Sequence, residues 1–141
     1  MRVRSFVIAA MVVAFGMLAG VSAHHSFSAE FDVNKPVTLK GTIVRMDWIN
    51  PHSWLHVEVK QPDGTAVPWK FEFGTPNSLI RRGFRPKDLP VGAEVSVTGY
   101  RTLDGSNAAA ASDIVLADGR KLFAGSSDTP GADEKKPTSP Y

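Results

Sequence analysis

The sequence of 141 residues contains no cysteine. Disulfide bonds, thiolate nucleophiles and cysteine-containing metal sites are therefore excluded, and a folded domain must be stabilised by its hydrophobic core alone. Long apolar runs are also lacking, since the longest, residues 6–18, is shorter than the ~20 residues that span a bilayer. The sequence has no HExxH motif, no nucleophile elbow and no glycine-rich phosphate loop. Enzyme classes that depend on these motifs are excluded.

The apolar run near the amino terminus fits a cleaved secretory signal. Two arginines precede it, and residues 21–23 (Val-Ser-Ala) provide the small side chains that signal peptidase requires. An uncleaved anchor helix is the alternative interpretation. Cleavage after Ala23 makes His24 the first residue of the mature chain. We therefore expect a signal peptide over residues 1–23 and a periplasmic or secreted protein without a membrane anchor.

The charges of the mature chain balance. The full sequence has 16 Lys and Arg against 14 Asp and Glu, but two arginines leave with the predicted signal. Nucleic-acid binding needs a basic surface that releases counterions from phosphates. We therefore expect no nucleic-acid partner.

The mature chain is expected to have three regions. Residues 24–35 form an N-terminal arm, whose Phe27 and Phe31 dock on the domain that follows. Residues 36–124 form one β domain. Residues 125–141 are rich in proline and small polar residues, which predicts a disordered tail that makes no contact with the domain.

Apolar residues recur at every second position of the predicted domain, which is typical of half-buried strands. Such strands are expected over residues 37–46, 53–60 and 66–73. Pro68 cannot donate to a β-ladder and places the start of the third strand at a sheet edge. The inward positions are expected to form one core, made of Leu55, Val57, Val59, Trp69, Phe71, Phe73, Val95, Val97, Ile114 and Leu116.

One segment breaks the period of two. Residues 75–83 begin with Thr75 as the N-cap and end at a glycine, which predicts a short helix with Leu79 and Ile80 inward. Two further strands and a hairpin at residues 118–119 follow. This order is that of an OB-fold, so we expect an all-β protein with one short helix, an OB-fold-like five-stranded partly open barrel in which Gly41 allows a sharp bend. A split β-sandwich is the alternative.

Four segments of the sequence resemble a family of small exported bacterial proteins described only as a domain of unknown function. These segments are HHSFSAEFD at residues 24–32, WINPHSW at 48–54, FEFGTPNSLIRRGF at 71–84 and LADGRKLFAGS at 116–126. The resemblance implies export and a small β domain. It implies no activity, no cofactor and no catalytic residues.

All four histidines, His24, His25, His52 and His56, lie in the first third of the mature chain. After cleavage, His24 can chelate a metal through its α-amine and Nδ1, and His52 or His56 can supply a further imidazole. Three nitrogens of this kind suit copper, with zinc as the other metal to consider. The alternative is that these are ordinary exposed, turn-capping or strand histidines.

Aromatic and basic residues provide a second set of candidates. Those expected to contact a ligand near the first loop or on outward strand faces are Trp48, Asn50, Trp54 and Tyr100. Arg81 and Arg82, with Arg85 nearby, are candidates for binding an anionic group. Core packing for the aromatics and a solvated helix end for the arginines are the alternatives.

Two functional hypotheses result. The first is an exported, non-catalytic OB-like module that binds an unknown small ligand. The second is a periplasmic copper-binding protein that uses His24 with His52 or His56. An enzyme is not expected, because Ser53 and its neighbours in a strand point to opposite faces. Glu58 and Glu72 are expected to face outward and to form cross-strand charge pairs with lysines.

Overall fold

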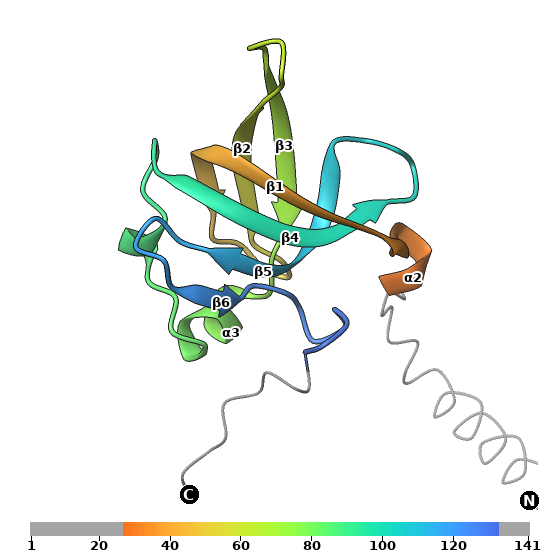
Figure 1. The fold of residues 1–141 in the computed structure, drawn as a ribbon. Helices are drawn as coiled ribbons and strands as arrows, with labels where there is room; N and C mark the ends of the chain where they lie inside the picture. Colours follow the sequence, from red (N-terminus) through yellow and green to blue (C-terminus); the bar gives the residue numbers. More distant parts are fainter. Residues whose placement is uncertain (1–26, 133–141) are drawn as a thin grey trace, which may run out of the picture.

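The computed structural model describes residues 27–132, in which six strands form a ring-like and mostly antiparallel sheet (Figure 1). The strands are β1 (Phe31–Asp47), β2 (Trp54–Lys60), β3 (Ala66–Glu72), β4 (Glu94–Thr102), β5 (Ala108–Val115) and β6 (Lys121–Phe123). The helical segments are α2 (Phe27–Glu30), α3 (Pro76–Arg81) and the 3-10 turn η1 (Pro86–Asp88). The expected all-β, partly open barrel with a short helix after its third strand is confirmed. β6 is the second strand of the hairpin predicted at residues 118–119.

Hydrogen bonds join the strands in the order β3-β2-β1-β4-β5-β6. A parallel pairing between the second half of β3 and β5 closes the ring, and within it Glu72 lies opposite Ala110. Pro68 lies in the first half of β3, which pairs with β2 alone. A proline fits this position because its missing N–H leaves no ladder hydrogen bond unmade, as the sequence predicts.

β1 pairs with strands on both of its sides. Its first half pairs with β4 and its second half with β2. At Gly41 a Cβ atom would lie 2.9 Å from the carbonyl oxygen of Glu58, so a side chain here would force the two strands apart. A bulge between Ile43 and Arg45 leaves Val44 unpaired and exposed. The glycine and the bulge together let one strand belong to both sides of the ring.

The core lies inside the ring, where alternate residues of every long strand meet. Each of the ten predicted core residues is buried there. α3 adds Leu79, which is fully buried, but Ile80 is 45% exposed and its predicted inward position is wrong. The reason is that α3 has only six residues and touches the core along one narrow face. Its N-cap is confirmed, because Thr75 Oγ1 accepts a hydrogen bond from the Ser78 N–H at 3.2 Å.

Both ends of the described chain contact the barrel. Phe27 lies 5.2 Å from Phe31 and 5.7 Å from Tyr100, measured between ring centroids, so the arm docks as predicted and β1 begins within it. The absence of contacts predicted from residue 125 onward is wrong. The Gly125 carbonyl accepts a hydrogen bond from Arg82, the residue that follows α3, and Thr129 is only 3% exposed. Residues 133–141 lie outside the described residues, as does the predicted signal peptide.

Figure 1 shows the tip of the β2–β3 hairpin at one end of the barrel and α3 at the other. No helix within residues 27–132 is long and apolar enough to span a membrane.

Candidate ligand-binding face

The outward side chains of β2, β3 and the second half of β1 form the face on which OB-type barrels bind their ligands. Residues directly opposite each other in a β-ladder lie side by side on such a face. The six residues of this face form two cross-strand rows, Asp47, Trp54 and Glu72 in the first and Arg45, His56 and Lys70 in the second. We call these six residues the outer face.

His56 is held from two sides on the outer face. Its Nε2 lies 3.1 Å from Oδ2 of Asp47 and 3.1 Å from Nη2 of Arg45. The Arg45 guanidinium also pairs with Asp47, with Nε 2.8 Å from Oδ1. Burial alone would raise the pKa of Asp47, but the hydrogen bonds and charges of Arg45 and His56 lower it below its usual value. The three side chains therefore form a closed polar cluster.

His52 has a separate carboxylate partner. Its Nδ1 is in close contact with Oε1 of Glu72. Burial raises the pKa of Glu72, and the nearby carboxylate of Glu30 raises it further. The charge and the hydrogen bond of His52 lower this pKa, but the effect of burial is larger and the pKa lies above its usual value. The predicted pairing of Glu72 with lysines on an exposed face is wrong, because its side chain is 11% exposed and contacts a histidine instead.

The described histidines belong to two different clusters. Within residues 27–132, no three His, Asp or Glu side chains lie close enough together to hold a metal ion. His24 and His25 lie outside the described residues, so their predicted role in metal binding stays a prediction.

A hollow of about 350 Å³ lies over the second row of the outer face. The loop before β5 forms one of its walls and is fixed in place by the backbone, where the Lys70 N–H donates to the Asn107 carbonyl at 3.1 Å. The hollow is lined by Val44, Arg45, His56, Val57, Glu58, Pro68, Trp69, Lys70, Ser106 and Asn107. Cationic and apolar groups therefore meet in one concave site.

The predicted aromatic candidates occupy different environments. Trp54 is half-buried on the outer face, and Nζ of Lys70 lies 5.1 Å from its ring centroid. Trp48 packs against the core. Tyr100 is on β4, where the ring of Phe27 contacts it edge-on. Trp54 is thus the one predicted aromatic that the structure places on the outer face.

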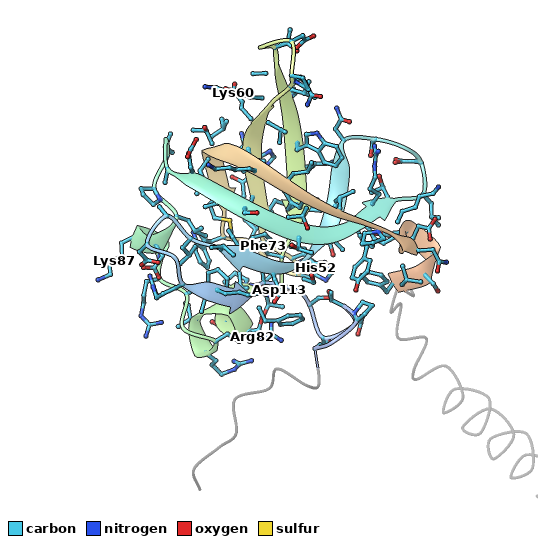
Figure 2. The ribbon with its side chains drawn as sticks, in the orientation of Figure 1. His52, Lys60, Phe73, Arg82, Lys87 and Asp113 are labelled. Carbon is cyan, nitrogen blue, oxygen red and sulfur yellow. The ribbon has the colours of Figure 1, made fainter. Side chains whose placement is uncertain are left out.

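The predicted arginines lie at the other end of the barrel. Arg82 donates from Nη1 to the Gly125 carbonyl at 2.6 Å, and its guanidinium lies 4.8 Å from the ring centroid of Phe123. Burial lowers the pKa of Arg82, and the adjacent charge of Arg81 lowers it further. Figure 2 shows Arg82 beside α3, apart from His52. These contacts join the end of α3 to Phe123 and Gly125. The remaining candidate, Asn50, is exposed in the loop between β1 and β2.

Sequence reasoning missed four residues around the hollow and the His56 cluster, namely Arg45, Asp47, Lys70 and Asn107. The alternation of β3 was a usable signal for Lys70, because it predicts an outward side chain next to His56. No local pattern reveals the bulge at Val44, which sets the register that brings Arg45 opposite His56.

Comparison with known proteins yields a family and no activity. The model of a family of unknown function, DUF6152, matches residues 11–111, which confirms the resemblance found in the sequence motifs. No curated protein and no solved structure gives a significant match to the chain.

Proposed function

The chain belongs to the DUF6152 family of unknown function, and from the site geometry we propose that it is an exported, non-catalytic module that binds a small organic anion. The observation that carries this proposal is the hollow of about 350 Å³ on the outer face, with Arg45 and Lys70 on either side of His56. OB-type barrels bind their ligands on the same face. The volume lies within the range of small-molecule sites, about 300 to 1,000 Å³.

The chemistry of the wall indicates the class of ligand. The ammonium of Lys70 favours a carboxylate or phosphate group, and so does the guanidinium of Arg45, which also pairs with Asp47. Val44 and Pro68 provide apolar surface for the rest of the molecule. Glu58 also lines the hollow, and its negative charge disfavours a ligand with several anionic groups. We therefore propose a monoanion with an apolar body.

The position of Ser53 supports a role without catalysis. Ser53 is the hydroxyl residue closest in sequence to both described histidines, but it is fully buried. Among the residues that the structure describes, its Oγ has no hydrogen-bond partner. A serine nucleophile requires a base within hydrogen-bonding distance and access to a substrate.

Three probes of similar shape and different charge test the proposal: benzoate, benzamide and benzylamine. In a titration of ¹⁵N-labelled mature protein, benzoate is expected to shift the amide signals of Arg45, His56, Lys70 and Asn107 at lower concentration than the other two probes. Lys70→Gln should weaken benzoate binding by about tenfold, since one charge-assisted contact is lost. Equal responses to all three probes would contradict the proposal.

Lys40→Gln is the matched control for this titration. Lys40 is also a strand lysine, but it pairs with Glu94 at 3.2 Å and lies outside the hollow. Its replacement is expected to leave benzoate binding unchanged. A similar loss in both variants would assign the effect to overall charge and not to the hollow.

Copper binding is a second candidate function, favoured by the contact between His52 and Glu72. Histidines that bind metals usually donate their other ring N–H to a carboxylate or carbonyl, and His52 has this arrangement. His24, as the predicted first residue, would supply an α-amine and an imidazole. The copper content of mature protein with its native amino terminus tests this function. A stoichiometric amount supports it, and a copper-free protein after incubation with Cu(II) contradicts it.

A further inference from the structure

We infer that His56 couples anion binding in the hollow to the uptake of a proton. When protonated, its Nε2 holds Asp47 and releases Nη2 of Arg45 for the ligand, so the site takes up an organic anion together with a proton and binds it more tightly in acid. The inference rests on the anion-binding function proposed above and adds to it the regulation of the same site.

Nε2 of His56 has two partners that it cannot satisfy at the same time. It lies 3.1 Å from Oδ2 of Asp47 and 3.1 Å from Nη2 of Arg45. A carboxylate only accepts hydrogen bonds and a guanidinium only donates them, whereas one ring nitrogen bears either a proton or a lone pair. Nε2 therefore accepts from Arg45 when it is unprotonated and donates to Asp47 when it carries a proton.

Arg45 keeps its ion pair with Asp47 in both states, because this pair uses a different nitrogen. Nε of Arg45 lies 2.8 Å from Oδ1 and 3.1 Å from Oδ2 of Asp47. The guanidinium is thereby held in place while Nη2 loses its partner. Arg45 and His56 line the hollow and Asp47 does not. The donor that His56 gives up therefore becomes available to a ligand in the hollow.

The charges around the hollow favour proton uptake on anion binding. Two cations, Arg45 and Lys70, line the hollow. Two anions oppose them, Glu58 in the wall and Asp47 in the ion pair with Arg45, so these charges cancel when His56 is neutral. Protonation of His56 adds a net positive charge that attracts an anion. By linkage, the bound anion favours the protonated imidazole to the same extent.

The charged and titratable groups around His56 come from every element packed against it. An imidazole ordinarily changes charge between about pH 5 and pH 8, and a carboxylate near about pH 4. Burial raises the pKa of Glu72, so this carboxylate is the other group whose charge must be controlled for. The groups are Arg45 and Asp47 of β1, Glu58 of β2, Lys70 and Glu72 of β3, and Asp104 of the loop before β5, whose charge interacts with that of Lys70.

A pH series of benzoate titrations in mature protein tests the inference. Between about pH 5.5 and pH 8 benzoate stays ionised, because carboxylic acids titrate near about pH 4. Benzoate is expected to bind about tenfold more tightly at the acid end of the series. Calorimetry in buffers of different ionisation enthalpy should record net proton uptake on binding. The ¹⁵N shifts of the His56 ring should show a larger doubly protonated fraction when benzoate is bound.

His56→Gln removes the titrating group and keeps both hydrogen bonds, because an amide donates to Asp47 and accepts from Arg45 simultaneously. Its benzoate affinity should vary by less than about twofold across the series, since glutamine does not titrate. Asp47→Asn leaves the Arg45 charge unopposed and should bind benzoate about tenfold more tightly than wild type at about pH 8. His52→Gln and Glu72→Gln are the matched controls, for the other described histidine and for the buried carboxylate, and should keep the wild-type pH dependence.

The outcomes separate the inference from the proposed function. Equal benzoate affinity across the series, or a pH dependence that survives in His56→Gln, would overturn the inference and leave anion binding in place. So would an Asp47→Asn variant that binds benzoate no more tightly than wild type at the alkaline end. A protein that binds no benzoate at any pH would refute the function and the inference together.

Circular dichroism checks the fold of each variant. If His56→Gln does not fold, the wild-type protein decides. Ring ¹⁵N shifts of His56 that do not change with benzoate, together with no net proton uptake, would overturn the inference without any variant.

Discussion

Nε2 of His56 lies 3.1 Å from Oδ2 of Asp47, its partner from the adjacent strand β1. This contact separates the two described histidines, because His52 makes its carboxylate contact with Glu72 on the other neighbouring strand, β3. The imidazole of His56 on the outer face is therefore enclosed by an ion pair, whereas the imidazole of His52, in the loop before β2, contacts its carboxylate through Nδ1. The hollow adjoins the first of these histidines and not the second.

Replacement of Glu72 is expected to change how stability depends on pH. Burial raises the pKa of Glu72 in the folded state above its value in the unfolded chain. The folded state then binds this proton more tightly, so the contribution of Glu72 to the free energy of unfolding is fully present in acid and is lost as the pH rises through the folded-state pKa. Glu72→Gln has no such proton. Its stability relative to wild type should increase as the pH rises above about 4, the usual pKa of a glutamate in the unfolded chain.

Urea unfolding at several pH values measures this difference. Glu58→Gln is the matched control for the loss of one carboxylate, since Glu58 is an exposed acid on the neighbouring strand. A stability difference between wild type and Glu72→Gln that stays constant with pH, or that moves in favour of wild type as the pH rises, would show that burial does not dominate at Glu72.

Trp69→Ala is expected to lower the free energy of unfolding by about 3 to 5 kcal/mol. Trp69 is 8% exposed, its ring stacks on Phe71 at 6.1 Å, and the guanidinium of Arg101 lies 5.0 Å from its centroid. Removal of the ring leaves a cavity in the core and removes the aromatic face that the Arg101 guanidinium contacts. Trp54→Ala on the outer face is the control and should cost clearly less, as measured by urea unfolding. Equal losses would mean that Trp69 is not a core residue.

Thr75→Ala is expected to lower the free energy of unfolding by about 1 kcal/mol. The substitution removes the hydroxyl that accepts the Ser78 N–H at the start of α3. Thr75→Ser retains an accepting oxygen and should keep most of the stability. A serine variant as unstable as the alanine variant would assign the loss to packing of the threonine methyl group and not to capping.

Two truncations test where the folded domain ends. A mature chain that ends at residue 132 is expected to unfold at the same temperature as the full mature chain. A chain that ends at residue 124 loses the Arg82 hydrogen bond to Gly125 and the buried Thr129, and should be destabilised by about 1 to 3 kcal/mol. Thermal unfolding measures both. Identical midpoints for the two truncations would show that the folded domain ends at residue 124, as the sequence predicted.

The sequence alone determined the strands β2 and β3, their faces and ten residues of the core. The alternation in β2 and β3 predicted that Leu55, Val57, Trp69 and Phe71 would be buried, and all four are. Such a pattern is sufficient because the side chains of a strand alternate between two faces, so one buried face fixes the other. The N-cap at Thr75 was also predictable from local sequence, because its hydrogen bond joins residues that are only three apart in the chain.

Only the tertiary structure decided which polar residues meet. His52 and Glu72 are twenty residues apart in the chain, and their contact requires the register of the β2–β3 ladder. Arg45 faces His56 because a bulge shifts that register by one residue, and Arg82 reaches Gly125 across 43 residues. Local sequence fixes the face on which a side chain lies. Its partners on that face depend on bulges and on ring closure, which arise from contacts between distant parts of the chain.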